Sequence, residues 1–153
     1  MQSFMISTGF FSTPAFWQNA LYFAGSLQWH GDKLKRLLFD PSSGQFNPSP
    51  VSQSAFIFNF PGATPSISSQ GSLNGIVWAI DSSHTGNSVP FQPGPAVLFA
   101  YDATNLAKEL WDSSQAGGNR DKAGGAVKFM VPRVANGKVY IGTRTELDVY
   151  GLL

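Results

Sequence analysis

Apolar strands and turn-forming residues follow one another in short runs along the chain, and three of these runs share one layout. Each has a Pro near its start, then a short strand, a turn rich in Asn or Gly, and a β-branched or aromatic strand. The three runs are "TPAFWQNALYFAG" from Thr13, "TPSISSQGSLNGIVWAI" from Thr64 and "VPRVANGKVYIGT" from Val131. Because Asn and Gly tolerate the positive φ that tight hairpin turns require, we expect hairpin turns at "QNA", "LNG" and "ANGK".

A second pattern follows each opening: an apolar strand that ends in an aromatic residue, at Phe39, Tyr101 and Tyr150. In the first two copies Asp40 or Asp102 comes next, followed by a turn and another aromatic residue. An Asp at the start of a turn accepts hydrogen bonds from backbone N–H groups two residues on. We therefore expect "AYDATNLAKELWDSS" to form a strand, an Asp-led turn and a strand. A helix over residues 104–111 is the alternative, because "NLAKELW" contains good helix formers.

Together the patterns predict four strands per unit, with units at about 13–54, 64–115 and 129–153. The third unit lacks a fourth strand, and inserts at 81–95 and 112–128 interrupt the repeat. Repeats of about 40–50 residues with four strands each are typical of β-propellers. We predict an all-β fold over residues 1–153: a β-propeller segment of about three four-stranded antiparallel blades, the last one incomplete. Upstream, "SFMIST" is expected to be a further strand.

Composition supports this fold and narrows the function. Charged residues make up 12% of the chain and aromatic residues 14%, and the chain has 16 Gly and 10 Pro, a balance that suits many short strands and tight turns. The net charge of +1 gives no basic field for nucleic acid, and the absence of cysteine excludes disulfides and thiolate metal sites. The N-terminal run fits neither a membrane span nor a signal peptide. We expect a cytoplasmic protein, or a periplasmic or secreted one if an export signal lies upstream.

The stretch "FAYDATNLAKELWDS" resembles the blade motif of the quinoprotein-like propellers, which carry pyrroloquinoline-quinone repeats. The resemblance covers most of residues 13–153, is strongest from Thr64 onward, and points to the carboxy-terminal blades of a longer propeller. It implies that Trp111 packs between neighbouring blades and that Asp40 and Asp102 belong to the same structural blade motif. Because family propellers have about six to eight blades, we expect a fragment of a longer chain. The alternatives are a ring closed by pairing of two copies and, after it, sheets that curl into a smaller sandwich.

Quinone-binding members of that family use a calcium site, a stacking Trp and often two adjacent cysteines. This chain has no cysteine, and no matching set of calcium ligands can be placed on it. We therefore expect no cofactor and no metal. Pyrroloquinoline quinone with calcium is implied only if the chain is an oxidoreductase.

Strand alternation in a propeller brings the loops between second and third strands, and the links between units, to one face. That face is the expected place for a ligand, and no catalytic residue is predicted on it. Taken alone, His30 and His84 are more simply interpreted as solvated loop residues. Trp29, next to His30, is expected to be able to stack on a sugar or a peptide. The candidate ligand-binding residues are Trp29, His30, His84, Arg120, Asp121 and Lys122.

These observations favour a non-catalytic binding or scaffold module that belongs to a larger propeller. Its expected partners are another protein or the missing blades, with a homo-oligomer as one option, and neither nucleic acid nor a membrane span. The first alternative is a quinone-dependent oxidoreductase or the remnant of one. The second is a sugar-binding module that uses Trp29 and the insert at 81–95.

Overall fold

The computed structural model describes residues 1–5, 7, 9–27, 30–84 and 94–151, which form an almost entirely β structure. The prediction of an all-β chain is confirmed. The strands are β1 (Ala15–Trp17), β2 (Ala20–Phe23), β3 (Ser26–Leu27), β4 (His30–Asp40), β5 (Gln45–Phe46), β6 (Ser52–Phe58), β7 (Ser66–Gln70), β8 (Leu73–Asp81), β9 (Val97–Asp102), β10 (Glu109–Asp112), β11 (Arg133–Ala135), β12 (Lys138–Gly142) and β13 (Leu147–Tyr150). A single 3₁₀ turn, η1 (Gly117–Asn119), is the one helical element among the described residues.

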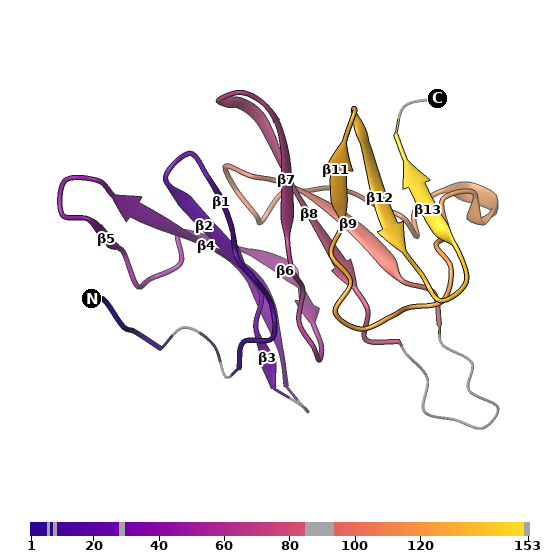
Figure 1. Cartoon of the computed structure of the whole chain (residues 1–153), viewed down its shortest axis with the longest axis horizontal. Helices are drawn as coiled ribbons and strands as arrows, with labels where there is room; N and C mark the ends of the chain where they lie inside the picture. The colour runs from indigo at the N-terminus through magenta and orange to yellow at the C-terminus, as the bar shows by residue number, and fades with distance from the viewer. Residues whose placement is uncertain (6, 8, 28–29, 85–93, 152–153) are drawn as a thin grey trace.

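The strands form three antiparallel sheets that follow one another along the chain (Figure 1). The first sheet has the order β1-β2-β4-β6, with β3 and β5 as short additions to β4. The second sheet is β7-β8-β9-β10, and the third is β11-β12-β13. Each is a meander in which consecutive main strands are neighbours. This arrangement is compatible with propeller blades, and the last sheet has three strands where the first two have four.

The second sheet lies between the other two and uses both of its faces to form a core. One face carries Val77, Ala79 and Phe99, which pack against Tyr22 and Phe58 of the first sheet. The other face packs against the third sheet in a cluster formed by Ile80, Ala96, Leu98, Ala123, Ala126, Val139 and Ile141. Alternate residues of a strand point to opposite faces, so the run "VWAI" supplies both cores.

The first and second sheets meet most closely at Gly75. A Cβ built on this residue would lie 2.6 Å from two ring carbons of Trp17, so only a glycine leaves room for the indole. The same indole donates its Nε1–H to the carbonyl oxygen of Gly71, at 3.0 Å. Trp17 of β1 is therefore held against the β7–β8 hairpin.

Two of the three predicted hairpin turns lie where the sequence places them. Gln18–Asn19 joins β1 to β2 with φ of 47° and 54°, and Asn136–Gly137 joins β11 to β12 with φ of 51° and 71°. These positive values are those of type I′ turns, whose twist matches that of the strands.

The prediction of a turn at "LNG" is wrong. The β7–β8 turn is formed by Gly71 and Ser72, and Asn74 lies within β8 with a φ of 54°. The pairing changes register between Ser68 and Gln70, which places an extra residue of β8 at this point. The residue with positive φ thus forms a β-bulge rather than a turn, a role that Gly or Asn in the left-handed region can also fill.

The stretch at residues 100–114 contains no helix. Strand β9 ends at Asp102, a turn follows, and β10 begins at Glu109. The Asp102 carboxylate accepts hydrogen bonds from the backbone N–H of Thr104, at 2.9 Å, and from its hydroxyl, at 2.6 Å. The Asp40 carboxylate likewise accepts the N–H and hydroxyl of Ser42. Both Asp-led turns form as predicted.

Two further differences concern the first unit. "SFMIST" is not a strand in its described residues, because the N-terminal segment attaches by isolated contacts, such as the two hydrogen bonds between the Gln2 amide and the main chain of Phe46. The fourth strand, β6, continues to Phe58, beyond the predicted end at 54. The β4–β6 pairing shifts register between Lys33 and Lys35, and at this bulge the Ser54 hydroxyl accepts the N–H of Leu34. The pairing of β6 with β4 therefore continues beyond residue 54.

Candidate functional site

The residues expected on the ligand-binding face lie on different elements of the fold. His30 is the first residue of β4, exposed and opposite Leu27 of β3, rather than part of a loop. The His84 Nδ1 lies 3.3 Å from a carboxylate oxygen of Asp81, and Asp81 is buried at the end of β8. Trp29 lies outside the described residues.

The charged residues predicted for this face lie beside the third sheet. Arg120 donates two hydrogen bonds to the Asp121 carboxylate, at 2.7 and 2.9 Å, and this pairing lowers the pKa of Asp121. The Tyr150 hydroxyl donates to the Asp121 carbonyl, at 3.1 Å, which ties the loop to β13. Lys122 is exposed. An exposed ion pair of this kind contributes little to stability.

Figure 1 places the surroundings of His30 and of Arg120 at different edges of the molecule. Strand β3, which pairs with His30, lies at the lower edge, whereas the short peach-coloured turn η1, just before Arg120, lies at the right-hand edge. None of the hydrogen bonds and ion pairs found for the described residues joins a histidine to Arg120, Asp121 or Lys122. That all six residues serve one ligand stays a prediction.

The residues proposed as a structural blade motif lie at strand ends and between sheets. Asp40 and Asp102 hold their turns, and Trp111 of β10 packs against the core shared by the second and third sheets. The ring of Trp111 meets that of Tyr150 edge-on, with centroids 5.7 Å apart. Burial, followed by the nearby charge of Asp148, raises the pKa of Tyr150 to about 12.

A different surface brings the three units together. We call it the link face: residues 11–12 before β1, residues 60–64 between β6 and β7, Ser82 just after β8 and residues 128–131 before β11, near the lower edge in Figure 1. These segments line a shallow depression that is open to solvent. Its lining residues are Phe11, Ser12, Pro61, Gly62, Thr64, Ser82, Phe129 and Met130.

Aromatic rings from three successive links form a row across this face. The rings of Phe11 and Phe60 meet edge-on with centroids 5.1 Å apart, and those of Phe60 and Phe129 with centroids 6.3 Å apart. Such edge-to-face pairs are favourable arrangements of aromatic rings. Phe11 and Phe129 remain largely exposed. The row therefore connects three segments that are far apart in sequence while leaving two of its rings open to solvent.

The repeat itself explains why these rings meet. Phe11 stands three residues before Pro14 in "FSTP", and Phe129 stands three residues before Pro132 in "FMVP". Phe60 precedes Pro65 in the longer link "FPGATP". Each unit thus carries one Phe just ahead of its opening Pro, and the sheet order brings the three rings together. A Phe ahead of each opening Pro is visible in the sequence, although the predicted binding residues are only charged residues, histidines and Trp29.

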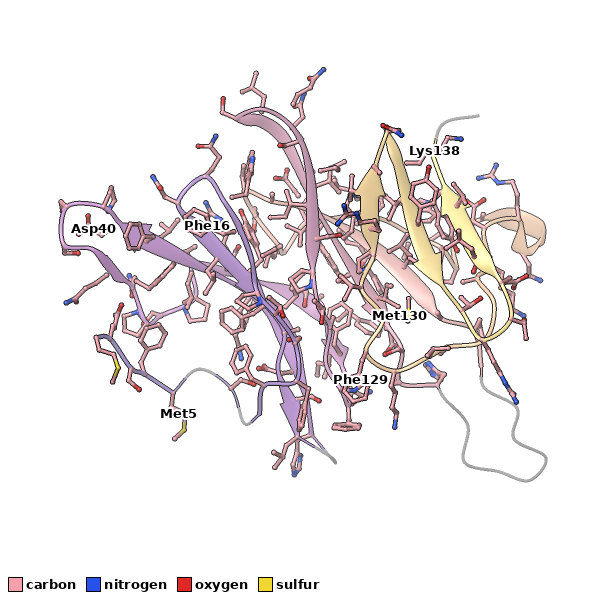
Figure 2. The ribbon with its side chains drawn as sticks, viewed as in Figure 1. Met5, Phe16, Asp40, Phe129, Met130 and Lys138 are labelled. Carbon is pink, nitrogen blue, oxygen red and sulfur yellow. The ribbon has the colours of Figure 1, made fainter. Side chains whose placement is uncertain are left out.

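Phe129 has an unusual backbone conformation for an exposed aromatic residue. Its φ is +68°, in the left-handed region that bulky residues rarely adopt, and its side chain is 57% exposed. Figure 2 shows its ring at the lower edge, directed away from the ribbon, with Met130 just above. Strained conformations of this kind cluster at binding and active sites.

A positive charge borders the row. The Lys128 ammonium lies 4.9 Å from the ring centroid of Phe60, a cation–π distance. The link between β6 and β7 also makes a close turn beside the end of β2. A Cβ at Gly62 would lie 2.7 Å from the carbonyl oxygen of Ala24, and the φ of Gly62 is +86°. These contacts hold the β6–β7 link, and with it Phe60, in place.

Carboxylates gather on β10, away from the link face. Burial and the neighbouring Asp112 raise the pKa of Glu109, and the side-chain amide of Gln115 donates to both carboxylates, at 3.3 and 2.8 Å. Asp112 also accepts the N–H and hydroxyl of Ser114. Because Asp112 is engaged in its own turn, this pair is best understood as structural.

Within the described part of the chain, no three His, Cys, Asp or Glu residues are grouped so that they could hold a metal ion. Among these described residues nothing supports the calcium site that the quinone alternative would need. No helix of the described residues has the length and apolar character needed to cross a membrane. Comparison with protein-family models, curated proteins and solved structures gave no significant match to this chain.

Proposed function

We propose that this chain is a non-catalytic binding module whose link face receives a segment of a partner polypeptide. The observation that carries the proposal is the row of Phe11, Phe60 and Phe129, which the repeat supplies from three links and leaves partly exposed. Exposed aromatic residues on a fixed scaffold are typical anchors of protein–protein interfaces.

The shallowness of the depression favours contact with a partner surface over catalysis on an enclosed small molecule. The space between its lining atoms is open to solvent, whereas small-ligand sites bury most of the ligand's surface. Its lining offers the hydroxyls of Ser12, Thr64 and Ser82 but no titratable side chain. General acid–base chemistry needs such a group within hydrogen-bond reach of the substrate.

Lys128 gives this surface a preference for acidic partners. Its ammonium lies over Phe60 at the border of the row, in a chain whose net charge is only +1. A partner with an apolar or aromatic side chain to lie against the row of rings and an acidic residue beside it would be complementary in polarity and charge. We therefore expect short acidic-aromatic or acidic-aliphatic segments as ligands.

The two alternatives lack comparable support. The quinone-dependent oxidoreductase requires a metal donor set that the described residues do not provide. The sugar-binding module depends on Trp29 and on an insert whose residues 85–93, like Trp29, lie outside the described residues. Its test remains quenching of Trp fluorescence by glycans, with loss in Trp29→Ala.

Selection from a random 12-residue peptide library on the immobilised chain tests the proposal. Enriched peptides should carry an apolar residue next to an acidic one and should bind Phe129→Ala at least tenfold more weakly. Phe16→Ala is the matched control, because Phe16 is also 57% exposed but lies on β1, away from the lower edge (Figure 2). Equal binding to both variants, or no enrichment at all, would contradict the proposal.

A further inference from the structure

The segment just ahead of β1 carries a further inference, which rests on the proposed binding of a partner polypeptide and concerns its control. Residues 9–12 form no strand, yet they supply Phe11, one end of the row of rings. We call these four residues the strap. The strap lies along residues 24–26, where the N–H of Ser26 donates to the carbonyl oxygen of Gly9, at 3.0 Å. The Ser12 hydroxyl donates to the carbonyl oxygen of Ala24, at 3.1 Å.

Residues 24–26 also support the next link of the link face. Ala24 forms an antiparallel bridge with Ala63, and Gly62 lies so close that a Cβ on it would be 2.7 Å from the Ala24 carbonyl oxygen. Phe60 belongs to that same link. One stretch of main chain therefore positions both Phe60 and the strap, and Phe11 meets Phe60 while the strap lies on it.

The fit of the strap depends on two glycines and one aromatic ring. A Cβ on Gly25 would overlap the carbonyl oxygen of Gly9, and a Cβ on Gly9 would lie 2.7 Å from the carbonyl oxygen of Ser26. The ring of Phe10 packs against that of Phe23 of β2, with centroids 5.3 Å apart, and Phe23 is fully buried. Phe10 is not part of the row, so its contact with Phe23 affects the row only through the strap.

The docked strap is held weakly. Among the described residues, two hydrogen bonds join it to residues 24–26. The hydroxyls of Ser7 and Ser26 are buried beside it without a hydrogen-bond partner in the described part of the chain. A buried hydroxyl without a partner costs stability. Segments with few hydrogen bonds open locally more readily than core strands do.

We propose that the strap exchanges between a docked and a released state, and that the partner segment binds the docked state, which alone completes the link face. Release takes Phe11 out of the row and leaves Phe60 and Phe129 in place. A partner that contacts all three rings binds the docked state more tightly and shifts the equilibrium toward it. Its apparent affinity falls with the docked fraction. Phe10 is therefore a positioning residue for Phe11.

Hydrogen exchange at the Ser26 amide tests the strap in the free chain, because this amide donates to Gly9 in the docked state. It should exchange about a hundredfold faster than the amides of β9, which is paired along both edges. Phe10→Ala should speed this exchange further, whereas Ser7→Ala, which removes an unpartnered hydroxyl, should slow it. Phe16→Ala is the matched control, since Phe16 is also exposed but lies on β1, and it should change nothing. Exchange as slow as that of β9, or unchanged in both strap variants, overturns the proposal.

Binding of a library-selected peptide tests the coupling of the strap to the partner site. Phe10→Ala should bind the peptide about tenfold more weakly, Ser7→Ala should bind it more tightly, and Phe16→Ala should bind it unchanged. Bound peptide should slow exchange of the Ser26 amide in the unmodified chain.

The two proposals fail on different variants. If Phe129→Ala loses binding while Phe10→Ala and Ser7→Ala bind as the unmodified chain does, the strap has no part in the site and this inference alone is overturned. If Phe129→Ala binds the peptide unchanged, the proposed function fails, and the Ser26 amide of the free chain still decides whether the strap opens.

Discussion

At the scale of single residues, Asp followed two positions later by Ser or Thr recurs where strands end. Asp40, Asp81, Asp102 and Asp112 all accept the backbone N–H of the residue two positions on. These carboxylates accept hydrogen bonds from backbone N–H groups that no longer pair with a neighbouring strand once the chain turns. A chain with only 12% charged residues thus uses several of its carboxylates to hold turns.

Asp102→Ala tests this role and its dependence on pH. Hydrogen bonds from Thr104, opposed in part by burial, hold the pKa of Asp102 below its usual value of 3.8. The ionised carboxylate therefore stabilises the fold above pH 4, and this contribution is lost as the pH falls through the lowered pKa. We expect the variant to lose about 1 kcal/mol of unfolding free energy at pH 7. The difference from the unmodified chain should shrink toward pH 2 in urea titrations; a constant difference would contradict this cause.

Phe129 provides a residue-scale test of backbone strain. At a φ of +68° a glycine avoids the steric cost that any side chain incurs. Phe129→Gly and Phe129→Ala both lose the ring and differ only in the strain of the backbone. Phe129→Gly should therefore be more stable than Phe129→Ala by about 1 kcal/mol. At Phe16, inside strand β1, the order should reverse. Thermal unfolding of the four variants checks both orders, and the same order at both sites would exclude strain at Phe129.

At the scale of elements, the sequence predicted the hairpins whose turns contain two residues of positive φ at the tip, Gln18–Asn19 and Asn136–Gly137. It placed the β7–β8 turn wrongly, because an Asn-Gly pair also suits a bulge, and the pairing of Gln70 with Leu73 puts the turn at Gly71 and Ser72. The link-face rings were missed for another reason. Their meeting depends on how the sheets stack, which no local pattern contains.

Gly137→Ala measures how much the β11–β12 turn depends on a residue that tolerates positive φ. The φ of Gly137 is +71° with open space around it, so an added methyl group causes strain but no clash. We expect a loss of about 1 kcal/mol in unfolding free energy. Gly117→Ala is the control, because it also has open space but no positive φ, and it should be close to neutral. Equal losses of unfolding free energy at both positions would show that the positive φ of Gly137 is not the cause.

Trp111→Ala tests the coupling between the second and third sheets. The indole packs on the shared core and against Tyr150, and removing a partly buried indole should cost about 2–3 kcal/mol. Near-ultraviolet circular dichroism should report the changed surroundings of Tyr150. A variant with unchanged stability would mean that the two sheets are held together elsewhere.

At the scale of the whole molecule, three stacked sheets give the chain two distinct outward surfaces. Links converge at the lower edge, where one Phe from each of three links meets its neighbour, while β13, which pairs only with β12 among the described strands, lies at the end of the stack. The central claim is that the first of these surfaces binds a partner polypeptide. The fold supplies it as a consequence of repetition, since each unit contributes one link and one ring.

Hydrogen exchange of the chain with and without a library-selected peptide tests that claim most directly. The account predicts slower exchange at the backbone amides of two of the three links, residues 60–64 and 128–131, with the β7–β8 and β11–β12 hairpin tips unchanged. Protection confined to β13, or to the hairpin tips at the opposite edge, would contradict it.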